Sequence, residues 1–286
     1  MVSIEKSANL ESTIIHPPDI ADERRSGGLA RLYGSAGFAR IRAAHAVVVG
    51  IGGVGSWAAE SLARSGVGRI TLIDMDVVAE SNLNRQAHAT IANLGRNKVD
   101  AMRERILSVA PGCFVNVIDD FVSTDNVTTI LPPGATFVID AIDKVNAKAG
   151  LVAHCRTLGL PIYVCGGSGG KTDTTRLVTS DLAFTEHDAL LAKLRLTLRR
   201  QYGFPRGGKK FKVTVVYCSQ RQLEAPEDGG AGLSCIGYGS AMHMTASMGL
   251  MLAGYALSNA ATAPTQLAPP APSLSRNPRV DPPPSR

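Results

Sequence analysis

Cysteine is scarce in this sequence, and no two cysteines are spaced as a Cys-x-x-Cys pair. The five stand apart, at Cys113, Cys155, Cys165, Cys218 and Cys235. Structural zinc sites commonly draw thiolates from such pairs, and small secreted domains rely on several disulfides. We therefore expect no zinc site and no disulfide framework, and a chain that occupies a reducing compartment.

A continuous apolar run is lacking in the amino-terminal segment MVSIEKSANLESTIIHPPDI, which carries Glu5 and Glu11. A secretory signal needs such a run, so we expect a cytoplasmic protein. Acidic residues are also the minority, because 24 of them stand against 30 lysines and arginines, for a net charge of +6. This excess favours an anionic partner.

Proline is unevenly distributed, with eight of the 16 prolines in residues 262–286. Proline has no backbone N–H and fits poorly inside helices and sheets. We therefore predict a disordered proline-rich tail over 262–286, and a flexible segment over 1–22. A role of the tail as a ligand for a proline-binding module stays open.

Short β-branched runs alternate with longer amphipathic segments between residues 46 and 165. The runs predict strands at 46–50, 69–74, 114–119, 136–141 and 161–166. The segments predict helices near 54–65, 96–109, 124–130 and 145–158. Such alternation is typical of an α/β fold, a doubly wound, mainly parallel sheet with helices on both faces. The pattern changes after residue 166, where a carboxyl-terminal substrate-binding lobe is predicted.

A glycine-rich motif, Gly50-Ile51-Gly52-Gly53-Val54-Gly55, directly follows the first predicted strand. Glycines at a strand–helix turn let the backbone approach a phosphate, whose charge the helix N–H groups then face. Asp74 ends the next predicted strand, where a carboxylate can accept hydrogen bonds from ribose hydroxyls. The motif predicts a Rossmann-like nucleotide site, and alone it fits an NAD(P)- or flavin-dependent oxidoreductase. Glycines required only for tight packing are the alternative.

The charged residues that follow the motif fit a triphosphate better than a dinucleotide. Arg85 and Lys98 can neutralise phosphates, and Asp143 follows the fourth predicted strand, where a carboxylate can hold Mg²⁺. NAD carries fewer phosphate charges and needs no metal. The sequence therefore predicts ATP and Mg²⁺ as the ligands of this site.

Several segments occur in the order and at the spacing of one enzyme superfamily: GIGGVGSWAAESLARSGVGRITLIDMDVV, SNLNRQ, GRNKVD and AIDKVNAK. They resemble the adenylating domain of the ubiquitin-activating (E1-like) enzymes, which include the ThiF- and MoeB-like enzymes. The resemblance covers about residues 24–260. With ARLYG, DDFV, GGSGG and CIGYG it extends to the tRNA threonylcarbamoyladenosine dehydratase branch, which similarly lacks the paired zinc cysteines of ThiF- and MoeB-like relatives.

That resemblance implies ATP-dependent cyclisation of N6-threonylcarbamoyladenosine, the modified adenosine next to the tRNA anticodon. The threonyl carboxylate attacks the α-phosphate of ATP and pyrophosphate leaves. The carbamoyl group then closes a ring as AMP departs, with net loss of one water. Orientation and charge neutralisation suffice for this ligase-like chemistry. Adenylation of a sulfur-carrier protein's carboxyl terminus, an NAD-dependent oxidoreductase and a non-catalytic binding module are the alternatives.

The resemblance also implies roles for individual residues. It places a phosphate loop at Gly50, Gly52, Gly53 and Gly55. It places the other nucleotide contacts at Asp74 (ribose), Asp76, Asn82, Arg85, Lys98 and Asp143. Arg85 and Lys98 aid pyrophosphate departure, and Asp143 positions the metal or the reacting phosphate.

A second subunit is implied as well, because the family completes its site with an arginine from the partner. Arg25 and Arg31 both lie in the matching segment, so the resemblance implies a homodimer. It also implies an adenylating domain at 23–165 and a substrate and tRNA lobe of the same unit at 166–261.

Residues 189–223 contain nine lysines and arginines and no acidic side chain. Phosphate neutralisation dominates the affinity of proteins for nucleic acids. We therefore predict a tRNA-binding surface formed by Arg199, Arg200, Lys209, Lys210 and Lys212. A solvated basic face is the alternative. The aromatic residues of the stretch are more typical of packing than of base stacking: Tyr202, Phe204 and Phe211.

Cys235 follows a glycine-rich segment at 227–234. In ThiF- and MoeB-like relatives a loop cysteine can form a thioester with the substrate, which makes Cys235 a candidate for that role. A structural cysteine is favoured, because the tethered carbamoyl group already supplies the nucleophile. Some family members act with a cysteine desulfurase and a sulfur acceptor, although no segment here identifies a docking site.

Charged residues are absent from 229–275, and 236–258 is long enough to cross a bilayer. His243 and several Ser, Thr and Gly residues dilute its hydrophobicity. We predict a buried helix there, with peripheral membrane association as the alternative. The segment 166–170 fits either a tight turn or a set of carbonyls that binds a monovalent cation.

Overall fold

The computed structural model of the protein describes residues 22–223 and 238–263. The flexible amino terminus and nearly all of the proline-rich tail, as predicted from the sequence, lie outside these residues. Cys235 lies outside them too, in the segment 224–237. These three predictions therefore stay predictions.

One seven-stranded sheet forms the centre of the protein, with strand order β3-β2-β1-β4-β5-β7-β6. Its strands are β1 (His45–Val49), β2 (Arg69–Ile73), β3 (Phe114–Ile118), β4 (Phe137–Asp140), β5 (Ile162–Cys165), β6 (Leu177–Asp181) and β7 (Thr214–Cys218). Every neighbouring pair is parallel except β6 with β7. Strands β1, β4 and β5 are buried throughout, which explains their unbroken apolar runs. The predicted doubly wound, mainly parallel sheet is confirmed.

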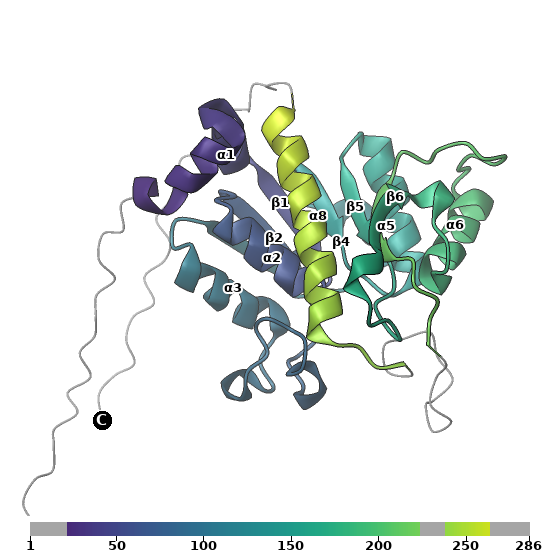
Figure 1. Ribbon diagram of the computed structural model, residues 1–286, viewed down its shortest axis with the longest axis horizontal. Coiled ribbons are helices and arrows are strands. Elements are labelled where there is room, and N and C mark those ends of the chain that lie inside the picture. The colour runs from purple at the N-terminus through teal and green to yellow at the C-terminus, as the bar shows by residue number, and fades with distance from the viewer. Residues whose placement is uncertain (1–21, 224–237, 264–286) are drawn as a thin grey trace, which may run out of the picture.

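Helices cover both faces of this sheet (Figure 1). One apolar cluster joins the sheet to α1 (Asp22–Ala43), α2 (Gly55–Arg64), α3 (Lys98–Val109) and α8 (Met242–Thr262). A second cluster joins it to α4 (Val127–Ile130), α5 (Val145–Leu158) and α6 (Ala189–Gln201). Short 3-10 helices lie in the connections: η1 (Glu80–Asn82), η2 (Ile91–Asn93), η3 (Thr174–Arg176) and η4 (Leu182–Phe184). Two parallel strands must be joined by a crossover connection, and helices form such connections here.

The residues after 166 continue this sheet. Strand β7 pairs with β5, and β6 pairs with β7. Helix α8 returns across the other half of the molecule, where it packs against α2 and α1. The described residues of the predicted lobe at 166–261 therefore extend the same layers.

Helix α8 explains the long uncharged stretch. Met244, Met248 and Leu252 have no exposed surface, and they belong to the cluster that α8 shares with α2 and the sheet. The buried face of α8 is apolar because it packs on this cluster, while Met242, Leu250 and Tyr255 on the same helix are exposed. The predicted helix is present, and 11 of its 21 residues are buried. Among the described residues, no helix combines the length and the apolar character that crossing a membrane requires.

The sequence pattern does not predict helix α1. Its four glycines lower helix propensity, and the helix bends at Gly34, whose φ is 71°. Contacts with distant residues hold it instead. Phe38 and Ile41 are buried, and Arg40 Nε donates a hydrogen bond to the carbonyl oxygen of Ala261 at 2.8 Å. Packing against α8 therefore decides the conformation of this segment.

Two buried histidines affect stability in mild acid. His88 is 1% exposed, and neither of its ring nitrogens has a hydrogen-bond partner among the described residues. Burial, followed by nearby Lys98 and Arg105, lowers the pKa of His88 to about 4. Burial, followed by Arg69, likewise lowers the pKa of His45 to about 4.

The free energy of unfolding should therefore fall as the pH is lowered from about 6.5 to about 4. The unfolded chain takes up these protons near pH 6.5, whereas the folded chain resists them until about pH 4. Urea unfolding at a series of pH values measures this. The variant His45→Gln/His88→Gln should show a flatter dependence across that interval, and an unchanged slope would contradict the assignment.

Candidate active site

The glycine motif forms the turn between β1 and α2, at the carboxyl edge of the sheet. Gly50 has a φ of 85°, and a Cβ atom there would lie 2.9 Å from the carbonyl oxygen of Ala141. A Cβ at Gly55 would lie 1.8 Å from the carbonyl oxygen of Gly50. A Cβ at Gly52 would meet no described atom within 4 Å. Close packing therefore requires Gly50 and Gly55, whereas Gly52 borders open space that a phosphate can occupy.

The start of α2 borders the same loop. No side chain caps this helix end, and its first turn has no acidic residue, so its partial positive charge stays available to an anion. Arg85 adds a full charge nearby, because a Cβ at Gly53 would lie 3.2 Å from Arg85 Cγ. The loop therefore has a helix dipole and the aliphatic part of the Arg85 side chain beside it.

Hydrogen bonds fix Arg85 in this place. Its Nη1 donates to the carbonyl oxygen of Ser81 at 2.7 Å and to Asn84 Oδ1 at 2.8 Å. Its own carbonyl oxygen accepts from Trp57 Nε1, on α2, at 2.9 Å. Asn84 Nδ2 in turn donates to the carbonyl oxygen of Ser240 at 2.9 Å. The sequence predicted Arg85, whereas the supporting roles of Asn84 and Trp57 depend on contacts between distant segments.

Asp74 connects the glycine loop to the end of β2. Its Oδ2 accepts a hydrogen bond from Ile51 N at 2.6 Å, and its Oδ1 accepts from Asp76 N at 2.8 Å. Burial raises the pKa of this carboxyl group, although those two N–H groups and Lys98 oppose the rise. Asp74 thus holds the loop in shape in addition to the ribose contact predicted for it.

Lys98 and Asp76 form an ion pair at the same edge. Lys98 Nζ lies 2.7 Å from Asp76 Oδ2, with the lysine side chain 7% exposed and the aspartate side chain 54% exposed. Lys98 N, at the start of α3, also donates to the carbonyl oxygen of Asp76 at 3.0 Å. The structure therefore brings together two of the predicted residues.

Two other predicted residues differ in their surroundings. Asn82 is 8% exposed, and its Oδ1 accepts a hydrogen bond from Ala79 N at 3.1 Å, so its amide stabilises η1. Asp143 is exposed beyond the end of β4, and its carboxylate has no hydrogen bond or ion pair to the described residues. No group of three metal-ligating side chains occurs among the described residues. A Mg²⁺ ion that enters with ATP needs only one or two carboxylates, since phosphates and waters supply the rest.

A buried ion pair that the sequence did not reveal supports this edge. Asp140, the last residue of β4, and Lys148, on α5, have no exposed surface, and Lys148 Nζ lies 3.0 Å from Asp140 Oδ1. Lys148 Nζ also donates to the carbonyl oxygen of Ile142 at 2.9 Å. Burial disfavours the ammonium charge, but Asp140, together with Cys165 and Asp188, outweighs burial and raises the pKa of Lys148. The pair fixes the turn containing Ala141, on which Gly50 packs.

A second pair of buried charges shapes the glycine turn 166–170. Asp188 Oδ2 accepts from Gly167 N at 2.9 Å, and a Cβ at Gly166 would lie 2.3 Å from this oxygen. Lys171 Nζ donates to the carbonyl oxygens of Cys218 and His187 at 2.5 and 3.1 Å. Burial lowers the pKa of Lys171. Tight packing therefore accounts for the first glycine of the turn.

The candidate arginines for a second subunit lie elsewhere. Arg31 is exposed on α1, which leads into the amino-terminal end of β1, away from the glycine loop (Figure 1). The side chain of Arg25 lies outside the described residues. A role of Arg31 in nucleotide binding therefore requires a second copy of the chain.

The predicted tRNA-binding cations also lie at the opposite edge of the sheet. Arg199 and Arg200 end α6, and the three lysines precede β7, which begins at the amino edge. Arg200 and the lysines are exposed. Phe204 and Phe211 are buried against each other with ring centroids 5.0 Å apart, which confirms packing as their role. The sequence could not show on which edge these cations lie.

The described cysteines are core residues. Cys113, Cys155, Cys165 and Cys218 are all buried. Burial raises the pKa of Cys155 to about 12, so that thiol stays protonated.

The open glycine loop, the carboxylate of Asp74 that holds it, and the cations Arg85 and Lys98 define a nucleotide-binding α/β protein with a site suited to phosphates. A model of the ThiF family matches residues 25–270. The chain therefore belongs to the ThiF family.

The proteins similar to this chain include tRNA threonylcarbamoyladenosine dehydratases. The chain is 44% identical over 233 residues to the tRNA threonylcarbamoyladenosine dehydratase of Haemophilus influenzae, covering 79% of this chain and 89% of that protein. Crystal structures of the Escherichia coli tRNA N6-threonylcarbamoyladenosine dehydratase in complex with AMP and with ATP are also similar, with TM-scores of 0.78 and 0.77. Each is 44% identical to this chain, and each alignment covers 83% of this chain and 94% of the other.

Proposed function

We propose that the protein is an ATP-dependent adenylating enzyme that cyclises N6-threonylcarbamoyladenosine in tRNA. The observation that carries this proposal is the nucleotide edge itself: open space at Gly52, Arg85 against Gly53, and Lys98 linked through Asp76 to the same loop. The 44% identity to dehydratases of this name, one of them solved with ATP, supports the substrate assignment.

These residues act by placing positive charge beside the triphosphate and by keeping the glycine loop in shape. Lys98 exchanges Asp76 for a phosphate oxygen, and Arg85 contacts the same triphosphate from the glycine-loop side. Both stabilise the negative charge that grows on pyrophosphate as it leaves. Asp74 keeps the loop in shape and accepts a hydrogen bond from a ribose hydroxyl. The substrate's own carbamoyl group then attacks the activated carboxylate, and its tethering replaces a protein nucleophile.

Further ligands and partners belong to this proposal. Asp143 would hold a Mg²⁺ ion, which neutralises phosphate charge when bound with ATP. The carbonyls of the 166–170 turn are the proposed place for a monovalent cation, although those of Gly169 and Gly170 already accept hydrogen bonds. A homodimer would bring Arg25 or Arg31 to the partner's site. A cysteine desulfurase system is the proposed protein partner, and the cytoplasm, with peripheral membrane association open, is the proposed location.

Pyrophosphate release tests the proposed function. Protein incubated with ATP, Mg²⁺ and tRNA carrying threonylcarbamoyladenosine should release pyrophosphate and AMP, and unmodified tRNA should give far less. A sulfur-carrier protein with a carboxyl-terminal glycine replaces the tRNA in a second arm, and NAD(H) replaces ATP in a binding assay. Release that depends on the carrier protein, or tight NADH binding without a response to ATP, would favour the corresponding alternative.

A further inference from the structure

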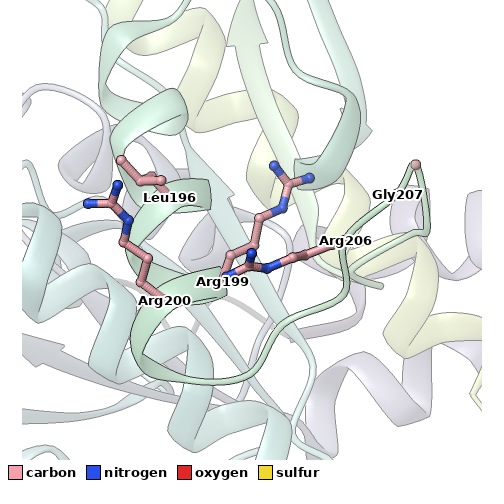
Figure 2. A pocket seen from close by; sticks show the side chains of 6 residues that line it. Leu196, Arg199, Arg200, Arg206 and Gly207 are labelled. Atoms are coloured by element: carbon pink, nitrogen blue, oxygen red, sulfur yellow. The ribbon is translucent and has the colours of Figure 1, made fainter.

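A pocket lined by arginines lies at the amino edge of the sheet. It has a volume of about 480 Å³ and is formed by Leu196, Arg199, Arg200, Arg206, Gly207 and Gly208 (Figure 2). The first three belong to the end of α6, and the others belong to the loop that follows. Figure 2 shows Arg206 extending from this loop toward α6, where it approaches Arg199.

The pocket concentrates positive charge without a counterion. No carboxylate lines it, and neither Arg200 nor Arg206 has an ion pair with the described residues. Arg199 Nε donates to the carbonyl oxygen of Pro205, at 3.2 Å, while its guanidinium lies 5.2 Å from the centre of the Phe211 ring. Guanidinium groups that share one hollow in this way suit a phosphate, which accepts their paired N–H donors.

The loop backbone leaves room for a large anion. Gly207 and Gly208 have φ values of 67° and 75°, and a Cβ at either would meet no described atom within 4 Å. The negative end of the α6 dipole accounts for arginines in the last helical turn. It does not account for Arg206, which lies beyond the helix, or for the two open glycines.

The length of helix α6 gives the distance of this pocket from the carboxyl edge of the sheet, where the nucleotide site lies. The helix begins at the carboxyl edge, where its capping residue Asp188 contacts Gly167, and its 13 residues run toward the amino edge. At 1.5 Å per residue the helix is about 20 Å long. Phosphates on one strand of a duplex advance about 3.4 Å along the axis, so this separation corresponds to several nucleotides.

We infer that the arginine pocket binds backbone phosphates of the tRNA body, several nucleotides away from the adenosine that reacts at the glycine-loop edge. The inference rests on the proposed function for the identity of the RNA and for the place of the reacting base. It adds Arg206 to the tRNA-binding residues that the sequence predicted in this basic stretch.

Equilibrium binding of unmodified tRNA tests this inference without requiring catalysis. The variant Arg200→Glu/Arg206→Glu changes exposed side chains only, so it should fold. We expect its affinity for tRNA to be weaker by about tenfold or more, and the log–log salt slope to fall by roughly 0.7–0.9 per lost phosphate contact. A seven-nucleotide anticodon-loop RNA should lose less than about twofold, because it is too short to reach the pocket.

A matched pair of single variants controls for charge alone. Arg200→Glu and Lys193→Glu make the same charge change at exposed positions of α6, but only Arg200 lines the pocket. Arg200→Glu should weaken tRNA binding clearly more than Lys193→Glu does. Equal effects of the two, an unchanged salt slope in the double variant, or an equal loss with the short RNA would overturn the inference. Failure of pyrophosphate release in the wild type, with these binding results intact, would instead count against the proposed function.

Discussion

Replacing Lys98 by alanine should lower turnover by about 100–1000-fold, the scale on which one preorganised donor stabilises a developing anion. The Lys98 side chain is 7% exposed, and its Nζ lies 2.7 Å from Asp76 Oδ2. In the proposed mechanism, its removal takes away a cation that faces the leaving pyrophosphate. The measurement is the single-turnover rate of AMP formation with saturating ATP and modified tRNA.

Two further variants test whether positive charge at this site is what turnover requires. Arg85→Ala should lose turnover on a similar scale, because it removes the second cation. Asp76→Asn removes the partner of Lys98 but keeps the ammonium, so its turnover should fall much less than that of Lys98→Ala. Near-wild-type rates in both Lys98→Ala and Arg85→Ala would remove these residues from the mechanism.

Replacing Lys148 by methionine should lower the free energy of unfolding by about 3–5 kcal/mol, because it leaves the carboxylate of Asp140 buried without its cation. Both side chains lack exposed surface, and the ion pair is 3.0 Å long. Methionine has a similar volume, so the loss reports charge rather than a cavity. Urea unfolding of wild type and variant gives the difference.

The double variant Asp140→Asn/Lys148→Met is the control for this prediction. Asparagine removes the unpaired charge and keeps an oxygen that can accept from Ile142 N, as Asp140 Oδ1 does at 3.0 Å. The double variant should therefore recover part of the lost stability. A double variant as unstable as the sum of the single variants would show that the ion pair contributes no coupling.

The strands, the glycine loop and the Asp74–Asp76 segment were predictable because their signals are local. The run AVVV followed by the glycine motif identifies a strand, a turn and a helix within a few residues. The five strands predicted before residue 166 are all present. Asp74 and Asp76 follow the second of them, and parallel strands carry such residues to one edge.

Other parts of the site depend on contacts that no local pattern encodes. Lys148 stands between small apolar residues of α5, where a lone lysine gives little indication that its partner is Asp140 on the neighbouring strand. Lys171 and Asp188 meet across the glycine turn in a similar way. The only available signal was a lysine on an otherwise apolar helix face, which predicts burial of the charge but does not identify its partner.

Cyclisation of the modified adenosine is tested by the mass of the nucleoside after the reaction. Wild-type protein is incubated with ATP, Mg²⁺ and tRNA carrying threonylcarbamoyladenosine, the tRNA is digested, and the nucleosides are analysed by mass spectrometry. We expect conversion to a product lighter by one water, with little conversion by Lys98→Ala or without ATP. A folded, ATP-binding protein that leaves the mass of this nucleoside unchanged would contradict it.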